Sequence, residues 1–418
     1  MPKRVRPLTL AGFASAALLL GACGSSGTSE GGSSPGGRAA AESTSDPDAP
    51  SGWGPTEGEL AEASRRVAEM SQAELAATVL MPGFWGYTAE EPTPAEVEAN
   101  QRMHGVGSAV EAVRGRDHES FFLRPEVIAD VTQVGVLASG LQSVVEERSG
   151  LPALLSIDQE GGTVQRLSEG VEVIPSAAYV GSTGDLDYAR EVALDNGETL
   201  AGLGVTMVMA LVADVDPDGG SVLGTRTYST DPEVASRMVV ATVRGYLDAG
   251  VLPVVKHFPG LGTVDGDSHS TLPVQGKSLK ELQGLDLRPF KAAIEAEAPV
   301  MMTGHVDVQV LDPGVPASVS PAVVQGLLRD TLGFEGVAVT DSQGMGPIYA
   351  TFGSGEGAVL SLIAGNDLVL NSPEPKEALQ AVQDAVADGR LPEERLIEAA
   401  TRVVALRLYQ QRLAQAPG

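Results

Sequence analysis

The stretch PEVASRMVVATVRGYLDAGVLPVVKH, residues 232–257, contains the structural unit on which the fold depends. Its first part, Pro232–Ala249, carries apolar residues at helical spacing. Its second part, Val251–Val255, is a short apolar run of the kind that forms a buried parallel strand, and it ends in Lys256-His257. A helix that leads into a buried strand is the repeating unit of parallel α/β folds.

The same alternation recurs through the rest of the chain. Other helical patterns are Glu126–Glu147, Leu279–Ala298, Pro321–Leu332, Gly355–Ala364 and Pro392–Leu413. The eight apolar runs are Val79–Phe84, Val106–Val110, Ala153–Ile157, Val205–Val212, Val251–Val255, Val300–Thr303, Val337–Thr340 and Asp367–Leu370. Eight strand-and-helix units predict an α/β fold, a single (β/α)8 TIM-type barrel over residues 55–418, with allowance for one irregular strand. A two-lobed α/β binding protein is the alternative, but no second shift in composition marks a lobe boundary.

The first 54 residues are expected to lie outside that domain. Basic residues near the start precede an apolar stretch, Leu8–Leu20, that is too short to span a bilayer comfortably. The following Leu20-Gly21-Ala22-Cys23 resembles a bacterial lipobox, which implies removal of residues 1–22 and lipidation of Cys23. A plain secretory signal is the alternative. Residues 23–54 are rich in Gly, Ser, Pro and Ala and are interpreted as a flexible tether. We therefore expect a lipid anchor that holds the protein on the extracytoplasmic face of the cell membrane.

Composition excludes several classes of function. The chain has 55 acidic and 28 basic residues and a formal net charge of -27, which disfavours binding to nucleic acid and excludes a polybasic membrane surface. The single cysteine excludes an intrachain disulfide and a zinc site built from cysteines. We expect no nucleic-acid partner.

Polar residues follow six of the eight apolar runs. They are Asp158, Asp214 with Asp216, Lys256 with His257, His305, Asp341 and Asn371. Barrel enzymes carry their chemistry at the carboxyl ends of the strands, so these residues predict an active-site mouth. Taken one at a time, each could equally be a residue that begins a loop and forms a turn or a cap.

Two features define the chemistry that this mouth could perform. In Asp267-Ser268-His269, the carboxylate can bind one imidazole nitrogen and leave the other for proton transfer. Asp341 ends the apolar run Gly336–Thr340, and a carboxylate on a rigid strand end can attack an electrophilic carbon. A carboxylate nucleophile with a separate proton donor is the arrangement of a retaining glycosidase.

Other chemistries lack their motifs in this sequence. The chain has no His-x-His pair after an early strand and no His-Glu-x-x-His, although a metal site assembled in space from His257, His269 and His305 stays open. It also lacks a convincing Gly-x-Ser-x-Gly elbow and a phosphate-binding Gly-x-x-x-x-Gly-Lys loop. We expect neither a metal ion nor an organic cofactor.

Three segments resemble family 3 of the glycoside hydrolases, in its β-N-acetylglucosaminidase branch. They are Ile157-Asp158-Gln159-Glu160-Gly161-Gly162 with Val164-Gln165-Arg166, then Lys256-His257-Phe258-Pro259-Gly260 with Asp267-Ser268-His269, and Val339-Thr340-Asp341-Ser342. The resemblance covers about residues 60–412. Leu261 and Thr263 depart from it, since many members carry His and Asp at these positions.

The resemblance implies a role for each matching residue. Asp341 would be the nucleophile, His269 the acid/base and Asp267 the residue that orients His269. Asp158, Arg226, Lys256 and His257 would bind the sugar, with Arg166 assisting.

The resemblance also implies the substrate class. We expect a monomeric enzyme that releases terminal N-acetylglucosamine from cell-wall oligosaccharides or muropeptides, with water or phosphate as acceptor. A β-glucosidase of the same family and a non-catalytic sugar-binding lipoprotein are the alternatives.

Overall fold

The computed structural model describes residues 46–415. The predictions for the signal segment 1–22, for Cys23 and for most of the tether lie outside the described residues. At the start of the described part, Pro50 pairs with Thr56 in a short antiparallel bridge. Trp53, which the sequence analysis assigns to the tether, is buried in the main hydrophobic core.

Eight strands form the centre of the fold. Six of them pair side by side, every pair parallel, in the order β11-β9-β7-β6-β3-β2. The strands β1 and β12 form a further parallel pair. The eight strands are β1 (Leu80–Met81), β2 (Ser120–Phe122), β3 (Leu154–Ile157), β6 (Met207–Val208), β7 (Leu252–Phe258), β9 (Val300–Thr303), β11 (Val337–Thr340) and β12 (Val369–Leu370).

Backbone contacts join the two groups of strands into a ring. A parallel bridge pairs Val339 of β11 with Leu368, directly before β12. On the other side, the Phe122 N–H in β2 donates to the Pro82 carbonyl after β1 at 3.0 Å. The predicted TIM-type barrel is thus confirmed, and its irregular strands are β1, β6 and β12, with two residues each.

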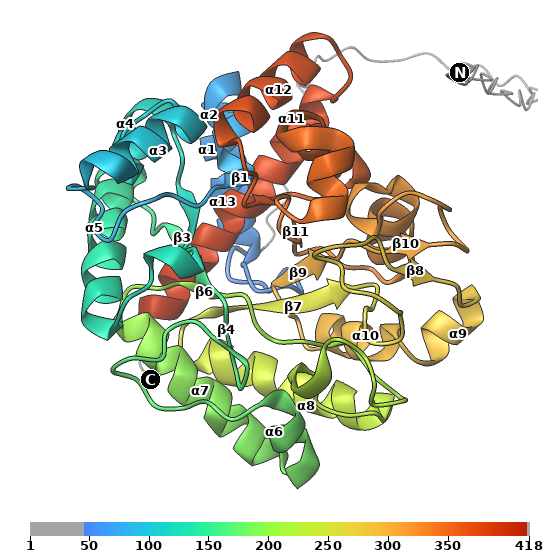
Figure 1. Cartoon of the computed structure of the whole chain (residues 1–418). Coiled ribbons are helices and arrows are strands. Elements are labelled where there is room, and N and C mark those ends of the chain that lie inside the picture. Colours follow the sequence, from blue (N-terminus) through green and yellow to red (C-terminus); the bar gives the residue numbers. More distant parts are fainter. Residues whose placement is uncertain (1–45, 416–418) are drawn as a thin grey trace, which may run out of the picture. The chain divides into compact units, whose positions relative to one another are not determined.

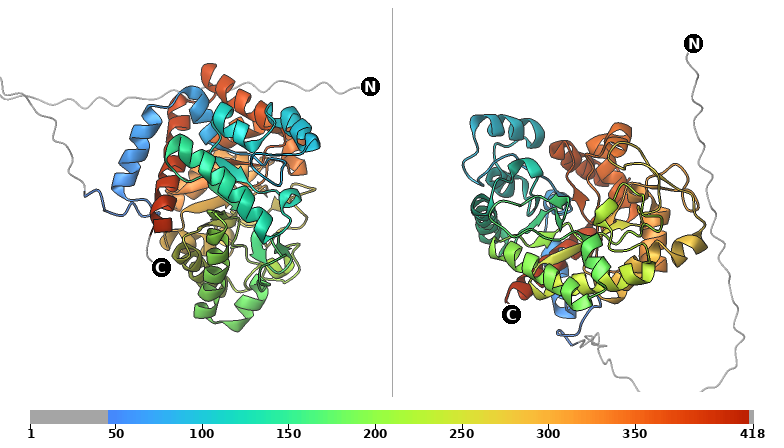
Figure 2. Two further views of the ribbon diagram at one scale, coloured as in Figure 1. Left: turned by 90° about the vertical axis from the view of Figure 1, so that its left-hand side faces the viewer. Right: turned by 60° about the horizontal axis from the view of Figure 1, so that its bottom comes forward.

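Helices surround these strands on the outside, as Figure 1 shows. The N-terminal helix α1 and the C-terminal helix α13 lie side by side and close one flank of the barrel (Figure 2). The α-helices are α1 (Glu57–Ala68), α2 (Gln72–Thr78), α3 (Pro94–His104), α4 (Ala109–Arg116), α5 (Val131–Ser149), α6 (Ala177–Thr183), α7 (Leu186–Gly202), α8 (Pro232–Asp248), α9 (Leu279–Gly284), α10 (Leu287–Glu295), α11 (Gly346–Ala364), α12 (Pro375–Ala387) and α13 (Glu393–Gln415). Among the described residues, no helix is both long and apolar enough to cross a bilayer.

The prediction for the second strand is wrong. The run Val106–Val110 leads into helix α4, because the Ser108 hydroxyl accepts a hydrogen bond from the Glu111 N–H and caps the helix. The second strand is β2, which lies outside all eight apolar runs of the sequence. Charged Glu119 directly precedes β2, and its ion pair with Arg407 of α13, 288 residues away, allows this segment to be buried. A local pattern cannot reveal such a partner.

Two predicted helices also differ in detail. The pattern Leu279–Ala298 forms two helices, α9 and α10, with Asp286 buried between them. The pattern Pro321–Leu332 forms a π-helix over Ala322–Thr331.

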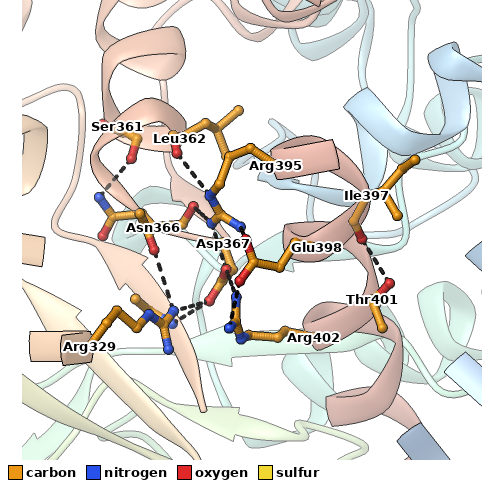
Figure 3. A network of polar contacts seen from close by, with 12 residues as sticks. Arg329, Ser361, Leu362, Asn366, Asp367, Arg395, Ile397, Glu398, Thr401 and Arg402 are labelled. Atoms are coloured by element: carbon orange, nitrogen blue, oxygen red, sulfur yellow. Dashed lines mark hydrogen bonds and ion pairs between the residues drawn. The ribbon is translucent and has the colours of Figure 1, made fainter. Parts of the chain in front are cut away.

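The two ends of the barrel differ in their polar residues. At the amino end of β12, Asp367 is fully buried and accepts a hydrogen bond from the Ala338 N–H. Arg329, Arg395 and Arg402 form ion pairs with this one carboxylate, as Figure 3 shows. Burial alone would raise the pKa of Asp367, but the three guanidinium groups hold it below its usual value. This network is structural, because active sites of barrels lie at the other end.

Candidate active site

A pocket of about 680 Å³ lies at the carboxyl ends of the strands. Its walls come from residues far apart in the sequence, from Trp85 after β1 to Pro373 after β12. Every residue that the sequence assigned to catalysis or sugar binding lines it: Asp158, Arg166, Arg226, Lys256, His257, Asp267, His269 and Asp341. The fold therefore brings all eight residues to one cavity.

Asp341 follows β11 and is held by backbone hydrogen bonds. Its N–H donates to the Thr303 carbonyl of β9 at 2.9 Å, and its Oδ1 accepts from the Ser342 N–H at 2.7 Å. Burial would raise the pKa of Asp341, but nearby His257, the Ser342 N–H and Lys256 outweigh burial and lower it. The side chain is thus an ionised carboxylate in a fixed position, as a nucleophile requires.

His305 supports this carboxylate indirectly, through the backbone of the next residue. Its Nε2 lies 3.0 Å from the Ser342 carbonyl oxygen, so Nε2 is the donor, and its Nδ1 accepts from the Ser318 hydroxyl at 2.7 Å. Burial lowers the pKa of His305, which favours this neutral form. The Ser342 backbone, with its carbonyl bound to His305 and its N–H bound to Asp341, thus links the two side chains. The sequence places His305 at a strand end, but gives no signal for this role.

His269 and Asp267 lie on the loop between β7 and β8 (Val274–Gln275). The His269 Nδ1 lies 2.7 Å from Asp267 Oδ1, and the same oxygen accepts from the His269 N–H at 2.9 Å. These hydrogen bonds lower the pKa of Asp267. Because Nδ1 is bound to Asp267, Nε2 is the nitrogen that remains for proton transfer. The side chains are 71% and 51% exposed, so this side of the pocket is open to solvent.

Glu160 organises the cations of the pocket. The Lys256 ammonium lies 2.6 Å from Glu160 Oε1, and the Arg226 guanidinium binds both carboxylate oxygens at 2.8 and 2.9 Å. Burial would raise the pKa of Glu160, but the two cations lower it to about 2. Lys256 also lies 3.4 Å from Asp158. Glu160 stands in one of the family-like segments without an assigned role. The signal that could have found Glu160 is the assignment of two cations, Lys256 and Arg226, to one pocket, because cations in a pocket need a nearby anion.

Asp214 fixes His257 and the beginning of the loop that carries Asp267 and His269. Its Oδ2 lies 2.7 Å from His257 Nδ1, and its Oδ1 accepts from the Leu261 N–H at 2.6 Å. The Asp214 side chain is fully buried. Leu261, which departs from the family pattern, is also buried and lines the pocket.

The outer wall of the pocket carries further cations and an aromatic ring. Arg166 is exposed at the mouth, and its backbone N–H donates to the Asp158 carbonyl at 3.3 Å. Arg124 also lines the pocket, and its guanidinium lies 4.7 Å from the centre of the Trp85 ring. Within residues 46–415, no group of three or more His, Cys, Asp or Glu side chains is arranged to hold a metal ion.

Comparisons with known proteins agree with this architecture. Beta-hexosaminidase LpqI from Mycobacterium tuberculosis is 35% identical over 292 residues, which cover 67% of this chain and 74% of that protein. A glycoside hydrolase family 3 β-N-acetylglucosaminidase from Paenibacillus sp. str. FPU-7 superposes with a TM-score of 0.76 at 35% identity, covering 84% of this chain and 64% of that chain. The chain thus spans slightly less than two thirds of the Paenibacillus protein.

A second solved structure is similar over nearly its whole length. The β-N-acetylhexosaminidase from Beutenbergia cavernae superposes with a TM-score of 0.70 at 29% identity, and the alignment covers 81% of this chain and 99% of that chain. Residues 106–406 match the model of the glycosyl hydrolase family 3 N-terminal domain, and this range includes the pocket residues from Asp158 to Asp341. The chain therefore belongs to family 3 of the glycosyl hydrolases.

Proposed function

We propose that this protein is a retaining exo-β-N-acetylglucosaminidase that releases terminal N-acetylglucosamine from saccharides derived from the cell wall. The observation that carries the proposal is that an ionised, partly buried Asp341 and the His269–Asp267 pair line the same pocket. The relatives named β-hexosaminidase and β-N-acetylglucosaminidase support the choice of sugar.

In the first step, Asp341 attacks the anomeric carbon while His269 protonates the leaving oxygen. The Ser342 N–H holds Oδ1 of Asp341, so Oδ2 is the oxygen that forms the bond to the sugar. The bond between the anomeric carbon and the leaving oxygen breaks, and a glycosyl-aspartate intermediate results.

In the second step, His269 removes a proton from water, and the water oxygen displaces Asp341 from the anomeric carbon. Two displacements leave the configuration of the sugar unchanged. The carboxylate of Asp267, bound to His269 Nδ1, stabilises the imidazolium that forms. Phosphate is the alternative acceptor, because the base is an imidazole and places no second carboxylate beside the anomeric carbon.

The remaining pocket residues would bind the sugar. Asp158 can accept hydrogen bonds from two hydroxyl groups, and Lys256, Arg226 and His257 can donate to the hydroxyl and acetamido oxygens. Arg166, at the mouth, would contact the next unit of the saccharide, such as a muropeptide.

The site of action is also part of the proposal. The lipobox-like segment supports a mature protein that begins at a lipidated Cys23 and acts on the outer face of the cell membrane. In cells that express the full chain, Cys23→Ser should move the protein from the membrane fraction to the soluble fraction. Unchanged membrane association would contradict lipidation at this residue.

The experiment that tests the function compares two aryl glycosides. The full chain should release nitrophenol from 4-nitrophenyl N-acetyl-β-glucosaminide much faster than from the matching β-glucoside, and Asp341→Ala should abolish the release. Product analysis with and without phosphate identifies the acceptor. Faster turnover of the glucoside would support a β-glucosidase instead. Binding without turnover would support a sugar-binding lipoprotein.

A further inference from the structure

A polar cluster closes the base of the loop that carries Asp267 and His269. We call Thr263, Gln275, Lys277 and Asp286 the loop clamp. The Thr263 hydroxyl donates to Asp286 Oδ1 at 2.5 Å, and the Gln275 side-chain amide donates to the Thr263 oxygen at 2.9 Å. The Lys277 ammonium lies 3.2 Å from Asp286 Oδ2. Residue 263 precedes the tip of the loop and residues 275 and 277 follow it, so the clamp joins its two ends.

The clamp is buried, although it is polar. Asp286 and Gln275 are each 1% exposed, and Thr263 is half-buried. Burial raises the pKa of Asp286, while Thr263 and Lys277 oppose that change by binding the carboxylate. A buried carboxylate without partners is costly, so the cluster holds its geometry only when its members are together.

The tip of the loop has few attachments to the rest of the barrel. The His269 carbonyl accepts from the Gly346 N–H at 3.2 Å, whereas the N–H groups of Ser270 and Thr271 donate to Asp267 within the loop itself. The chain on either side of the tip is fixed. Gly262 packs so closely on the Val215 carbonyl that an added Cβ would lie 2.1 Å from that oxygen. After the tip, the Pro273 carbonyl accepts from the Asp307 N–H at 2.9 Å.

We propose that the loop clamp positions the acid/base: Thr263 and Asp286 set the direction from which His269 reaches the leaving oxygen. The inference rests on the proposed function, in which His269 protonates that oxygen. Thr263 and Asp286 do not line the pocket, so they would act only through the loop and are positioning residues.

The test uses the dependence of the rate on the leaving group. Thr263→Val removes the hydroxyl at nearly constant volume. A misplaced acid should slow a glycoside with a poor leaving group, N,N′-diacetylchitobiose, and spare one with a good leaving group, 4-nitrophenyl N-acetyl-β-glucosaminide. We expect kcat/KM to fall about 10- to 100-fold for the first and less than about twofold for the second. The value of kcat/KM reports the first displacement, in which His269 acts as the acid.

Three further variants make the result specific. Thr263→Ser keeps the hydroxyl and should restore wild-type values for both substrates. Thr401→Val is the matched control, because its hydroxyl is exposed on α13 and donates only to the Ile397 carbonyl. Lys277→Met disturbs the clamp from its other end and should show the same dependence on the leaving group as Thr263→Val, even if Thr263→Val folds poorly.

The outcomes separate the clamp from the proposed function. Equal losses on both glycosides in Thr263→Val and Lys277→Met, or no loss on either, would overturn the positioning role. His269→Ala, measured alongside, should show the strongest dependence on the leaving group. If His269→Ala lacks this dependence, the acid role of His269 is wrong and the clamp proposal fails with it. If His269→Ala shows it and the clamp variants do not, only the clamp is wrong.

Discussion

The two catalytic sides of the pocket are built in opposite ways. Asp341 follows a barrel strand. The buried residues His305 and Ser318 support it through the backbone carbonyl and N–H of Ser342. His269 lies on a loop, and its side chain is 71% exposed. One side is fixed by hydrogen bonds at the ends of two strands, β9 and β11, whereas the other depends on the base of a single loop.

The difference corresponds to what each group has to do. A nucleophile attacks one carbon of a sugar that the pocket binds in one orientation, so a fixed carboxylate favours the transition state. A proton donor has to let the saccharide enter and then approach the leaving oxygen, and loops are the elements that move in this way. A rigid side and a movable side are therefore expected in the same site.

Replacing His269 should give the largest difference in kcat/KM between a poor and a good leaving group. In His269→Ala, we expect kcat/KM for N,N′-diacetylchitobiose to fall about 10²- to 10⁴-fold, the usual contribution of general acid catalysis. The loss for 4-nitrophenyl N-acetyl-β-glucosaminide should be much smaller, because nitrophenolate leaves with little protonation. Steady-state kinetics on both substrates measure the ratio. Asp341→Ala is the contrast, since it should abolish both reactions. An equal loss in His269→Ala would contradict the comparison.

The Asp367 network at the amino end of the barrel should stabilise the fold without taking part in the reaction. In Asp367→Asn, the three arginines in Figure 3 would lose their shared carboxylate, and the free energy of unfolding should fall by about 3–5 kcal/mol. The value of kcat/KM of the folded enzyme should not change. Urea unfolding and steady-state kinetics measure the two effects. Asp388→Asn is the control, because Asp388 forms an exposed pair with Arg390 and should leave stability unchanged. Lower kcat/KM in folded Asp367→Asn would show that the two ends are coupled.

A change at His305 should disturb the position of Asp341 and leave His269 unaffected. His305→Ala removes the donor to the Ser342 carbonyl and loosens the Ser342 backbone, whose N–H binds Asp341. We expect kcat/KM to fall about 10- to 100-fold, equally for both glycosides, because the displaced group is the nucleophile. Ser318→Ala, which removes only the partner of Nδ1, should give a smaller loss of the same kind. A loss that depends on the leaving group would show that His305 acts on the acid/base instead.

The sequence predicts the strands well where burial depends on local pattern. Val300–Thr303 and Val337–Thr340 are continuous apolar runs, and their strands have the predicted bounds. The strand β2 is the exception, because Glu119 is buried only through its pair with Arg407. Burial that depends on a distant ion pair leaves no local signal.

The candidate site divides in the same way. The residues proposed to bind the sugar stand at strand ends and in loop motifs, so residue type and spacing are enough to identify them. Type and spacing do not identify the residues that position these groups. Glu160, Asp214 and Asp286 bind Arg226, His257 and Thr263, which lie 66, 43 and 23 positions away, and only the closed barrel brings these pairs together. Sequence patterns identify the groups that do the chemistry more readily than those that position them.

Two other histidines extend the comparison from activity to stability. His104 and His118 are each 3% exposed and lie outside the pocket. The ring of His104 stacks on Phe84 with 3.7 Å between centroids, and its Nε2 donates to the Gly83 carbonyl at 3.1 Å. Burial lowers the pKa of His104 to about 3 and that of His118 to about 4. Both histidines therefore stay neutral in the folded protein at mildly acidic pH.

These buried histidines should make the fold sensitive to acid. Below about pH 6.5 the unfolded chain binds a proton at His118, while the folded chain does not until about pH 4. The free energy of unfolding should therefore be largest above pH 6.5 and fall as the pH decreases, with His118 responsible for about 1 kcal/mol at pH 5.5. Urea unfolding of wild type and His118→Gln at pH 7.5 and 5.5 isolates this contribution, because His104, whose pKa His118 also lowers, is kept neutral mainly by burial at both pH values. The variant should lose less stability between the two pH values. The same loss in both would mean that His118 takes up its proton in the folded protein, as an exposed histidine does.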